Sequence, residues 1–109
     1  MSAPPLTAAT WTWPADVVAF AEQQQVRPYL DPLRQALDRV FPTAQSVKVY
    51  VDEDPEIRDD RHITFDVVMP QEDIPDYGAA NRRWYDEFFR LCPTTLAPIF
   101  RVILIVTSA

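Results

Sequence analysis

The sequence predicts an α+β fold, a two-layer sandwich of order α-α-β-β-α-β in which helices cover one face of a small three-stranded mixed sheet. Three observations predict it. Apolar residues recur at helical spacing in three segments, and two segments of alternating apolar and polar residues flank an acidic loop. Eleven prolines punctuate the 109 residues, and most of them stand where an element should begin or end. We expect residues 1–10 to form a flexible lead and residues 11–109 to form a single α+β domain.

Prolines delimit the two helices that are predicted before the first strand. Pro14 opens the first helix, because a proline is tolerated in the first turn. Pro42 stops the second helix. Pro28 and Pro32 both lie near the start of this second helix, where only one of them suits the first turn. We therefore expect the helix to begin at Asp31 or to be kinked there.

The strands follow from the alternation of apolar and polar residues. Residues 46–52 and 62–69 both alternate, and they are expected to pair as an antiparallel hairpin. A third helix is predicted over residues 75–91 and a last strand over residues 99–106. This β-α-β order indicates a right-handed crossover, which makes the last two strands parallel.

Composition disfavours several classes of function. The formal net charge is −6, and a surface this acidic disfavours nucleic acid and anionic membrane as partners, because phosphate binding needs a basic surface. Gly78 is the only glycine, so the glycine-rich loops that hold ATP, GTP or NAD cannot be built in their usual form. Cys92 is the only cysteine, which excludes an internal disulfide and a cysteine-based zinc site. We expect this cysteine to be buried.

The sequence carries no signal for export or membrane insertion. Residues 1–5 have neither the charged nor the apolar region of a signal peptide. The longest purely apolar run, residues 102–106, is far too short to cross a bilayer. We therefore expect a cytoplasmic protein.

Negative charge is concentrated at the tip of the predicted hairpin. Ten of the sixteen carboxylates fall between Asp52 and Asp76. An acidic tip repels itself unless a metal ion or a basic partner offsets the charge. A solvated loop, partly neutralised by Arg58 and Arg61, is the simpler alternative. As a functional hypothesis, the loop over residues 52–61 docks on a basic protein surface through six carboxylates: Asp52, Glu53, Asp54, Glu56, Asp59 and Asp60.

A magnesium or manganese site is another use of the same charge, because both metals accept two or three carboxylates plus water. If Val51 lies opposite Ile63, Asp52 pairs with His62, and carboxylates meet the only imidazole of the chain. That histidine could then act as a general base oriented by Asp52 or Asp60. An EF-hand calcium loop is disfavoured because Ile57 stands where the loop needs glycine. The metal ligands would be Asp52, Asp54, Glu56, Asp60 and His62.

The last predicted strand is apolar on both faces, a pattern typical of strands that are covered on both sides. Because the domain has too few elements to cover both, we expect a homodimer through the face formed by Phe100, Val102, Leu104 and Val106. Alternatively, the N-terminal lead with Trp11 and Trp13 folds back over this strand. We favour these tryptophans as a clasp across the domain's own core. Tyr85 and Phe89 remain at a helix edge, where they serve an interface or complete the core.

Two function hypotheses follow. The first is a small non-catalytic protein without a cofactor that associates with a basic protein: a dimeric adaptor, regulator or antitoxin-like neutraliser. It rests on the acidic loop, the doubly apolar last strand and the lack of a catalytic or phosphate-binding signature. The alternative is a divalent-metal-dependent hydrolase that uses the hairpin carboxylates and His62. Lys48, the only lysine, is predicted to pair with Asp66 and is unavailable to such a site, so the sequence favours association.

Overall fold

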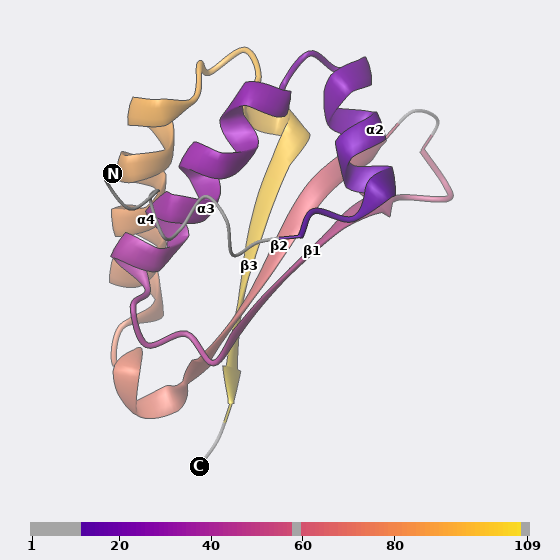
Figure 1. The fold of residues 1–109 in the computed structure, drawn as a ribbon. Helices are drawn as coiled ribbons and strands as arrows, with labels where there is room; N and C mark the ends of the chain where they lie inside the picture. Colours follow the sequence, from indigo (N-terminus) through magenta and orange to yellow (C-terminus); the bar gives the residue numbers. More distant parts are fainter. Residues whose placement is uncertain (1–11, 58–59, 108–109) are drawn as a thin grey trace, which may run out of the picture.

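A computed structural model describes residues 12–57 and 60–107 and shows the predicted small α+β fold (Figure 1). The predicted lead over residues 1–10, Trp11, Arg58 and Asp59 lie outside the described residues. The helices and strands are α2 (Ala15–Gln23), α3 (Leu30–Val40), β1 (Ser46–Glu53), β2 (Arg61–Pro70), α4 (Tyr77–Leu91) and β3 (Phe100–Thr107). Three short 3-10 segments connect them: η1 (Arg27–Tyr29), η2 (Gln71–Asp73) and η3 (Ala97–Ile99).

The sheet has the order β1-β2-β3, with β1 antiparallel and β3 parallel to the central strand β2. The predicted topology is therefore confirmed. The predicted register of the hairpin is confirmed as well, because three expected pairs lie opposite each other: Asp52 with His62, Tyr50 with Thr64, and Lys48 with Asp66. Since successive residues of a strand point to opposite faces, this register leaves one polar row of each strand on the open face.

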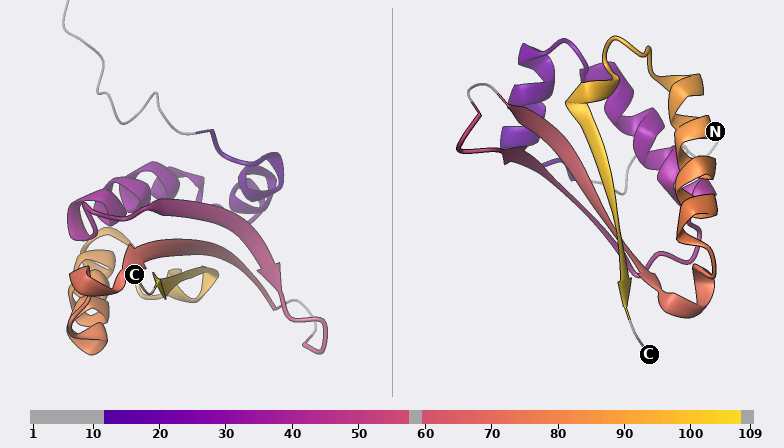
Figure 2. Two further views of the ribbon diagram at one scale, coloured as in Figure 1. Left: turned by 90° about the horizontal axis from the view of Figure 1, so that it is seen from below. Right: turned by 180° about the vertical axis from the view of Figure 1, so that it is seen from behind.

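The helices lie on one side of the sheet and make the second layer (Figure 2). In this layer α3 packs beside α4, while α2 lies next to β1 near the hairpin. The three helices and β2 contribute large apolar side chains that are at most 5% exposed, among them Phe20, Leu33, Phe65, Trp84 and Phe88. Burial of this apolar surface between the layers is the main term that stabilises the fold.

The two prolines near the start of the second helix belong to two different helical segments. Pro28 lies in η1, and Pro32 lies in the first turn of α3, which begins at Leu30. Neither proline removes a hydrogen bond that α3 needs, because the first four N–H groups of a helix have no partner inside it. The helix begins one residue before the predicted start at Asp31.

The residues of β3 that are exposed are only in part the ones that the sequence predicts. Phe100 and Leu104, two of the four predicted dimer residues, are only 8% and 6% exposed and belong to the core under the helices. The exposed apolar residues on the opposite face are Ile103 and Ile105, at 38% and 39%. The cause is the parallel register, in which Leu104 lies beside Val67 of β2, itself a core residue. Two of the four predicted dimer residues are therefore buried within the chain, whereas Val106 is 37% exposed.

Trp13 packs against the core as the predicted clasp. Its ring meets Phe65 edge-on, with the ring centroids 6.3 Å apart, and its indole Nε1–H donates to Asp31 Oδ1 over 2.9 Å. Cys92 is buried as expected, and burial raises the pKa of its thiol. A raised pKa keeps the thiol protonated at neutral pH and therefore poorly reactive.

The C-terminus of α2 ends in a turn that usually contains glycine. Val26 N–H donates to Ala21 C=O over 2.8 Å, and Gln25 N–H donates to Glu22 C=O over 3.1 Å. This pair of bonds is the Schellman motif, and it places Gln25 in the left-handed region with φ of 60°. Val26 is fully buried, so the turn brings the chain back into the core.

Replacing Gln25 with glycine is expected to raise the free energy of unfolding by about 0.5–1 kcal/mol, because glycine adopts positive φ without a Cβ clash. Thermal or urea unfolding measures the change. Gln24→Gly is the matched control: Gln24 has φ of −89°, so glycine there should lower stability by up to about 1 kcal/mol. Equal effects at the two positions would contradict the strain assigned to Gln25.

Candidate functional site

The acidic loop joins β1 to β2 and projects past α2 at the edge of the molecule (Figure 2). Main-chain hydrogen bonds order its described part. Asp54 N–H donates to Asp60 C=O over 3.1 Å, and Ile57 N–H donates to Asp54 C=O over 3.2 Å. The Asp54 carboxylate also accepts from Glu56 N–H over 2.9 Å, which is an Asx turn. The hairpin therefore presents its acidic residues from a hydrogen-bonded turn.

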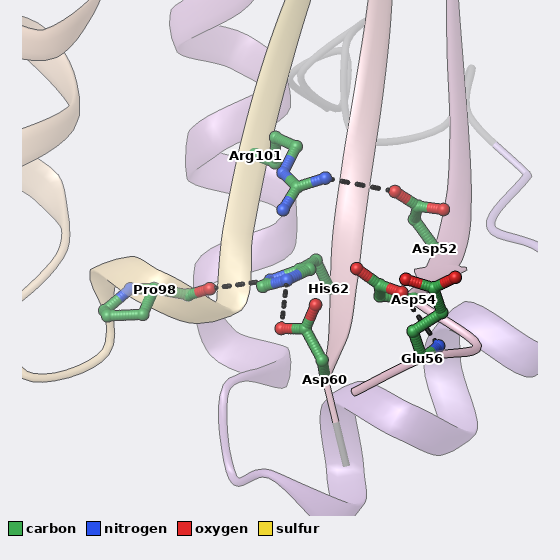
Figure 3. Close-up of polar contacts among 7 residues, drawn as sticks. All are labelled: Asp52, Asp54, Glu56, Asp60, His62, Pro98 and Arg101. Atoms are coloured by element: carbon green, nitrogen blue, oxygen red, sulfur yellow. Dashed lines mark hydrogen bonds and ion pairs between the residues drawn. The ribbon is translucent and has the colours of Figure 1, made fainter. Parts of the chain in front are cut away.

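Two of the predicted docking carboxylates, at the base of the loop, face basic side chains of the same chain (Figure 3). Asp52 Oδ2 accepts from Arg101 Nη1 of β3 over 3.1 Å, and Asp60 Oδ1 lies 2.8 Å from His62 Nε2. The Asp52–Arg101 pair is solvent-exposed, so it orients the side chains more than it stabilises the fold. The base of the hairpin is thus partly neutralised from within.

The tip keeps its negative charge and adds an apolar residue. Glu53 and Glu56 are exposed, Asp54 is half-buried, and the described residues include no ion-pair partner for any of the three. Ile57 is 55% exposed, the most exposed large apolar side chain among residues 12–57 and 60–107. Sequence reasoning missed Ile57 as a surface residue; the available signal was a single large apolar residue inside an acidic loop.

The predicted metal ligands do not gather at one point. Within the described residues, no group of three or more His, Cys, Asp or Glu side chains is placed to hold a metal ion. The candidates take part in separate contacts instead: Asp52 with Arg101, Asp60 with His62, and Asp54 with the main chain of Glu56. The register that brought Asp52 opposite His62 was correct, yet Arg101 is the residue that binds this carboxylate.

Both ring nitrogens of His62 face oxygen atoms (Figure 3). Nδ1 lies 2.9 Å from the Pro98 carbonyl oxygen, and Nε2 lies 2.8 Å from Asp60 Oδ1. The contact with Asp60 has the distance of an ion pair but lacks the angle of a hydrogen bond. His62 therefore links the start of β2 to η3 and takes Asp60, one of the two predicted aspartates, as its neighbour.

A pocket of about 460 Å³ opens beside this pair. Its wall includes Arg61, whose guanidinium carbon lies 4.7 Å from the centre of the Phe20 ring in a cation–π contact. The described lining offers amides and an acid–base pair, with no hydroxyl or thiol side chain to act as a nucleophile. It consists of Phe20, Gln23, Gln24, Asp60, Arg61, His62, Pro98 and Ile99.

The open face of the sheet carries a polar cover over its central strand. Arg101 reaches from β3 across β2 to Asp52 on β1 (Figure 3). Thr64 of β2 lies opposite Arg101 in the register and is fully buried. The Tyr50 hydroxyl donates to Asp66 Oδ1 over 3.1 Å. Burial, this hydrogen bond and the negative charge of Asp66 raise the pKa of Tyr50. Sequence reasoning placed Thr64 on this face correctly but did not predict its burial.

No known protein family, curated protein or solved structure matches this chain. Among the described residues, no helix is both long enough and apolar enough to cross a membrane.

Replacing Thr64 with valine is expected to raise the free energy of unfolding by up to about 1 kcal/mol. The buried Thr64 hydroxyl has no hydrogen-bond partner among the described residues, and valine keeps the shape while removing the unpaired oxygen. Urea unfolding measures the difference. Thr64→Ala is the control, because it also removes a methyl group and should destabilise the protein. A clear loss of stability in Thr64→Val would show that the hydroxyl is hydrogen-bonded.

Millimolar Mg²⁺ or Mn²⁺ is expected to leave the thermal midpoint unchanged, because the described carboxylates are dispersed among separate contacts. Binding at 100 times the dissociation constant would add about 2.7 kcal/mol, a shift of several degrees. Sodium chloride at equal ionic strength is the control, because it screens the repulsion between the hairpin carboxylates without binding as a divalent metal does. A rise that disappears in an Asp54→Ala/Glu56→Ala variant would instead support the metal-dependent hydrolase.

Proposed function

We propose that the protein is a non-catalytic association protein whose hairpin, residues 52–61, docks on a basic surface of another protein. The observation that carries the proposal is Ile57, which is exposed at a hairpin tip among carboxylates that have no ion-pair partner within residues 12–57 and 60–107. An exposed apolar residue surrounded by charge is the usual anatomy of a docking site, with a desolvated anchor inside a polar rim. Neither a metal site nor a solvated acidic loop requires that residue.

The charges of the hairpin support a division of roles. Asp52 and Asp60 are engaged by Arg101 and His62, so they hold the base of the hairpin to the sheet. Glu53, Asp54 and Glu56 remain available to a partner. In a chain of net charge −6, these residues attract a basic surface from a distance and increase the rate of encounter.

The proposal covers an adaptor, a regulator or an antitoxin-like neutraliser, because each acts by covering a surface of its partner. It places the protein in the cytoplasm, where a lone thiol such as Cys92 stays reduced. His62 and Asp60 beside the pocket are the observation that favours the second candidate, a metal-dependent hydrolase. The metal titration separates the two.

Neutralising the tip should weaken partner binding mainly through the association rate, and truncating Ile57 should weaken it mainly through the dissociation rate. The variants are Glu53→Gln/Asp54→Asn/Glu56→Gln and Ile57→Ser. We expect each to lose at least about tenfold in affinity, which corresponds to 1.4 kcal/mol. Affinity capture from cells with quantitative mass spectrometry identifies the partner, and surface plasmon resonance then measures both rates.

Glu72→Gln/Asp73→Asn is the matched control, because both residues are exposed and lie in η2, away from the hairpin. This variant should bind like the wild type. Basic proteins should be captured by the wild type and by this control, and lost from both hairpin variants. Capture that is the same for all four proteins, with the same salt dependence, would contradict the proposal.

A further inference from the structure

One edge of the described sheet has no neighbouring strand. β3 pairs with β2 over its whole length, and no strand within residues 12–57 and 60–107 pairs with its other edge. The carbonyl oxygen of Leu104 points to that free edge, where it accepts a long hydrogen bond of 3.5 Å from the hydroxyl of Tyr77 in α4. Because the main-chain groups of alternate residues point to opposite edges, Val102 and Val106 present theirs to the same side. An extended segment would satisfy this row of donors and acceptors.

Exposed apolar side chains are concentrated in β3 and α4. Seven large apolar side chains are exposed in the described part of the chain, and six of them belong to β3 or α4: Tyr77, Tyr85, Phe89, Ile103, Ile105 and Val106. On the helix side the rings of Tyr85 and Phe89 are stacked, with their centroids 6.0 Å apart. The flank of α4 that holds Glu87 packs on α3 through Arg39, so these rings lie on the flank away from α3.

Residues that normally protect an edge strand are few in β3. Natural sheets block such edges with lysine, proline, bulges or short strands. β3 has eight residues, its only charge is Arg101, and it runs without a bulge along β2. An exposed, regular and apolar edge of this length is a site for strand addition.

We infer that β3 pairs antiparallel with β3 of a second copy of the chain, across a two-fold axis at Leu104, to form one continuous six-stranded sheet. A free edge of a strand is self-complementary in this orientation, because each copy brings both donors and acceptors. The strand is already ordered by β2, so pairing costs little conformational entropy. The inference does not depend on the docking role of the hairpin.

The side chains of β3 favour this register. In an antiparallel pair, two residues that lie opposite each other both point their main-chain N–H and C=O groups toward the interface, or both point them away. A two-fold axis that relates the two strands must therefore coincide with a residue and not with the midpoint between two residues. An axis at Leu104 places Ile103 opposite the partner subunit's Ile105, and Arg101 opposite the partner subunit's Thr107. The exposed isoleucines of both copies then form one row on the open face, and no like charges meet. An axis at Ile103 would place Arg101 beside an isoleucine.

Sedimentation velocity tests the inference on the full chain. The wild type should have twice the chain mass of 12.6 kDa. In I103K/I105K each lysine faces a lysine across the axis, so this variant should be monomeric. In I103K/I105E each lysine faces a glutamate, so the dimer should return. A wild type that stays monomeric at about 100 µM, or an I103K/I105K variant that remains dimeric, would overturn the inference.

Two further readouts keep the test independent of variant folding and of the proposed function. Amide hydrogen exchange of the wild type should show protected N–H groups at Val102, Leu104 and Val106, with protection that increases with protein concentration. Rapid exchange there at every concentration would also overturn the inference. Ile57→Lys changes the hairpin alone and should remain dimeric, so failure of hairpin docking is distinguishable from failure of strand pairing.

Discussion

The alternation of residues along β2 is the constraint on which the rest of the structure depends. β2 is the central strand, and its register fixes which residues of both neighbours point to the helices. Phe65 and Val67 face the core, so Leu104 of β3 must do the same. A slip of one residue in either pairing would expose core residues and bury polar ones. The open face, with its polar cover and its exposed isoleucines, is therefore a consequence of the same register.

The hairpin and the sheet are joined by two sets of side-chain contacts that come from different strands. Arg101 on β3 reaches Asp52 on β1, and His62 on β2 lies between Asp60 and the carbonyl of Pro98. Such exposed or half-exposed contacts add little stability each, so their role is to fix where the acidic tip stands. Because of these contacts, the carboxylates at the base of the hairpin already face basic side chains, whereas those at the tip have no ion-pair partner among the described residues.

Local sequence patterns predicted the elements and the register, because alternation and helical spacing are strong signals over 8–15 residues. They did not predict which β3 face is exposed, because a strand that is apolar on both sides carries no signal for its orientation. The left-handed Gln25 was also missed, since glutamine is not a turn residue. The pocket beside His62 combines α2, β2 and η3, and residues so far apart in sequence share no local pattern.

The two proposed surfaces lie on different parts of the sheet, and this arrangement has a consequence for binding. The hairpin joins β1 and β2, whereas the free edge belongs to β3 on the far side of β2. A two-fold axis at Leu104 runs the second β3 in the opposite direction, so the two hairpins would stand at opposite ends of the shared sheet. A dimer of this kind leaves both tips accessible. It would bind a partner that carries two suitably spaced basic surfaces with an avidity that exceeds the affinity of either hairpin alone.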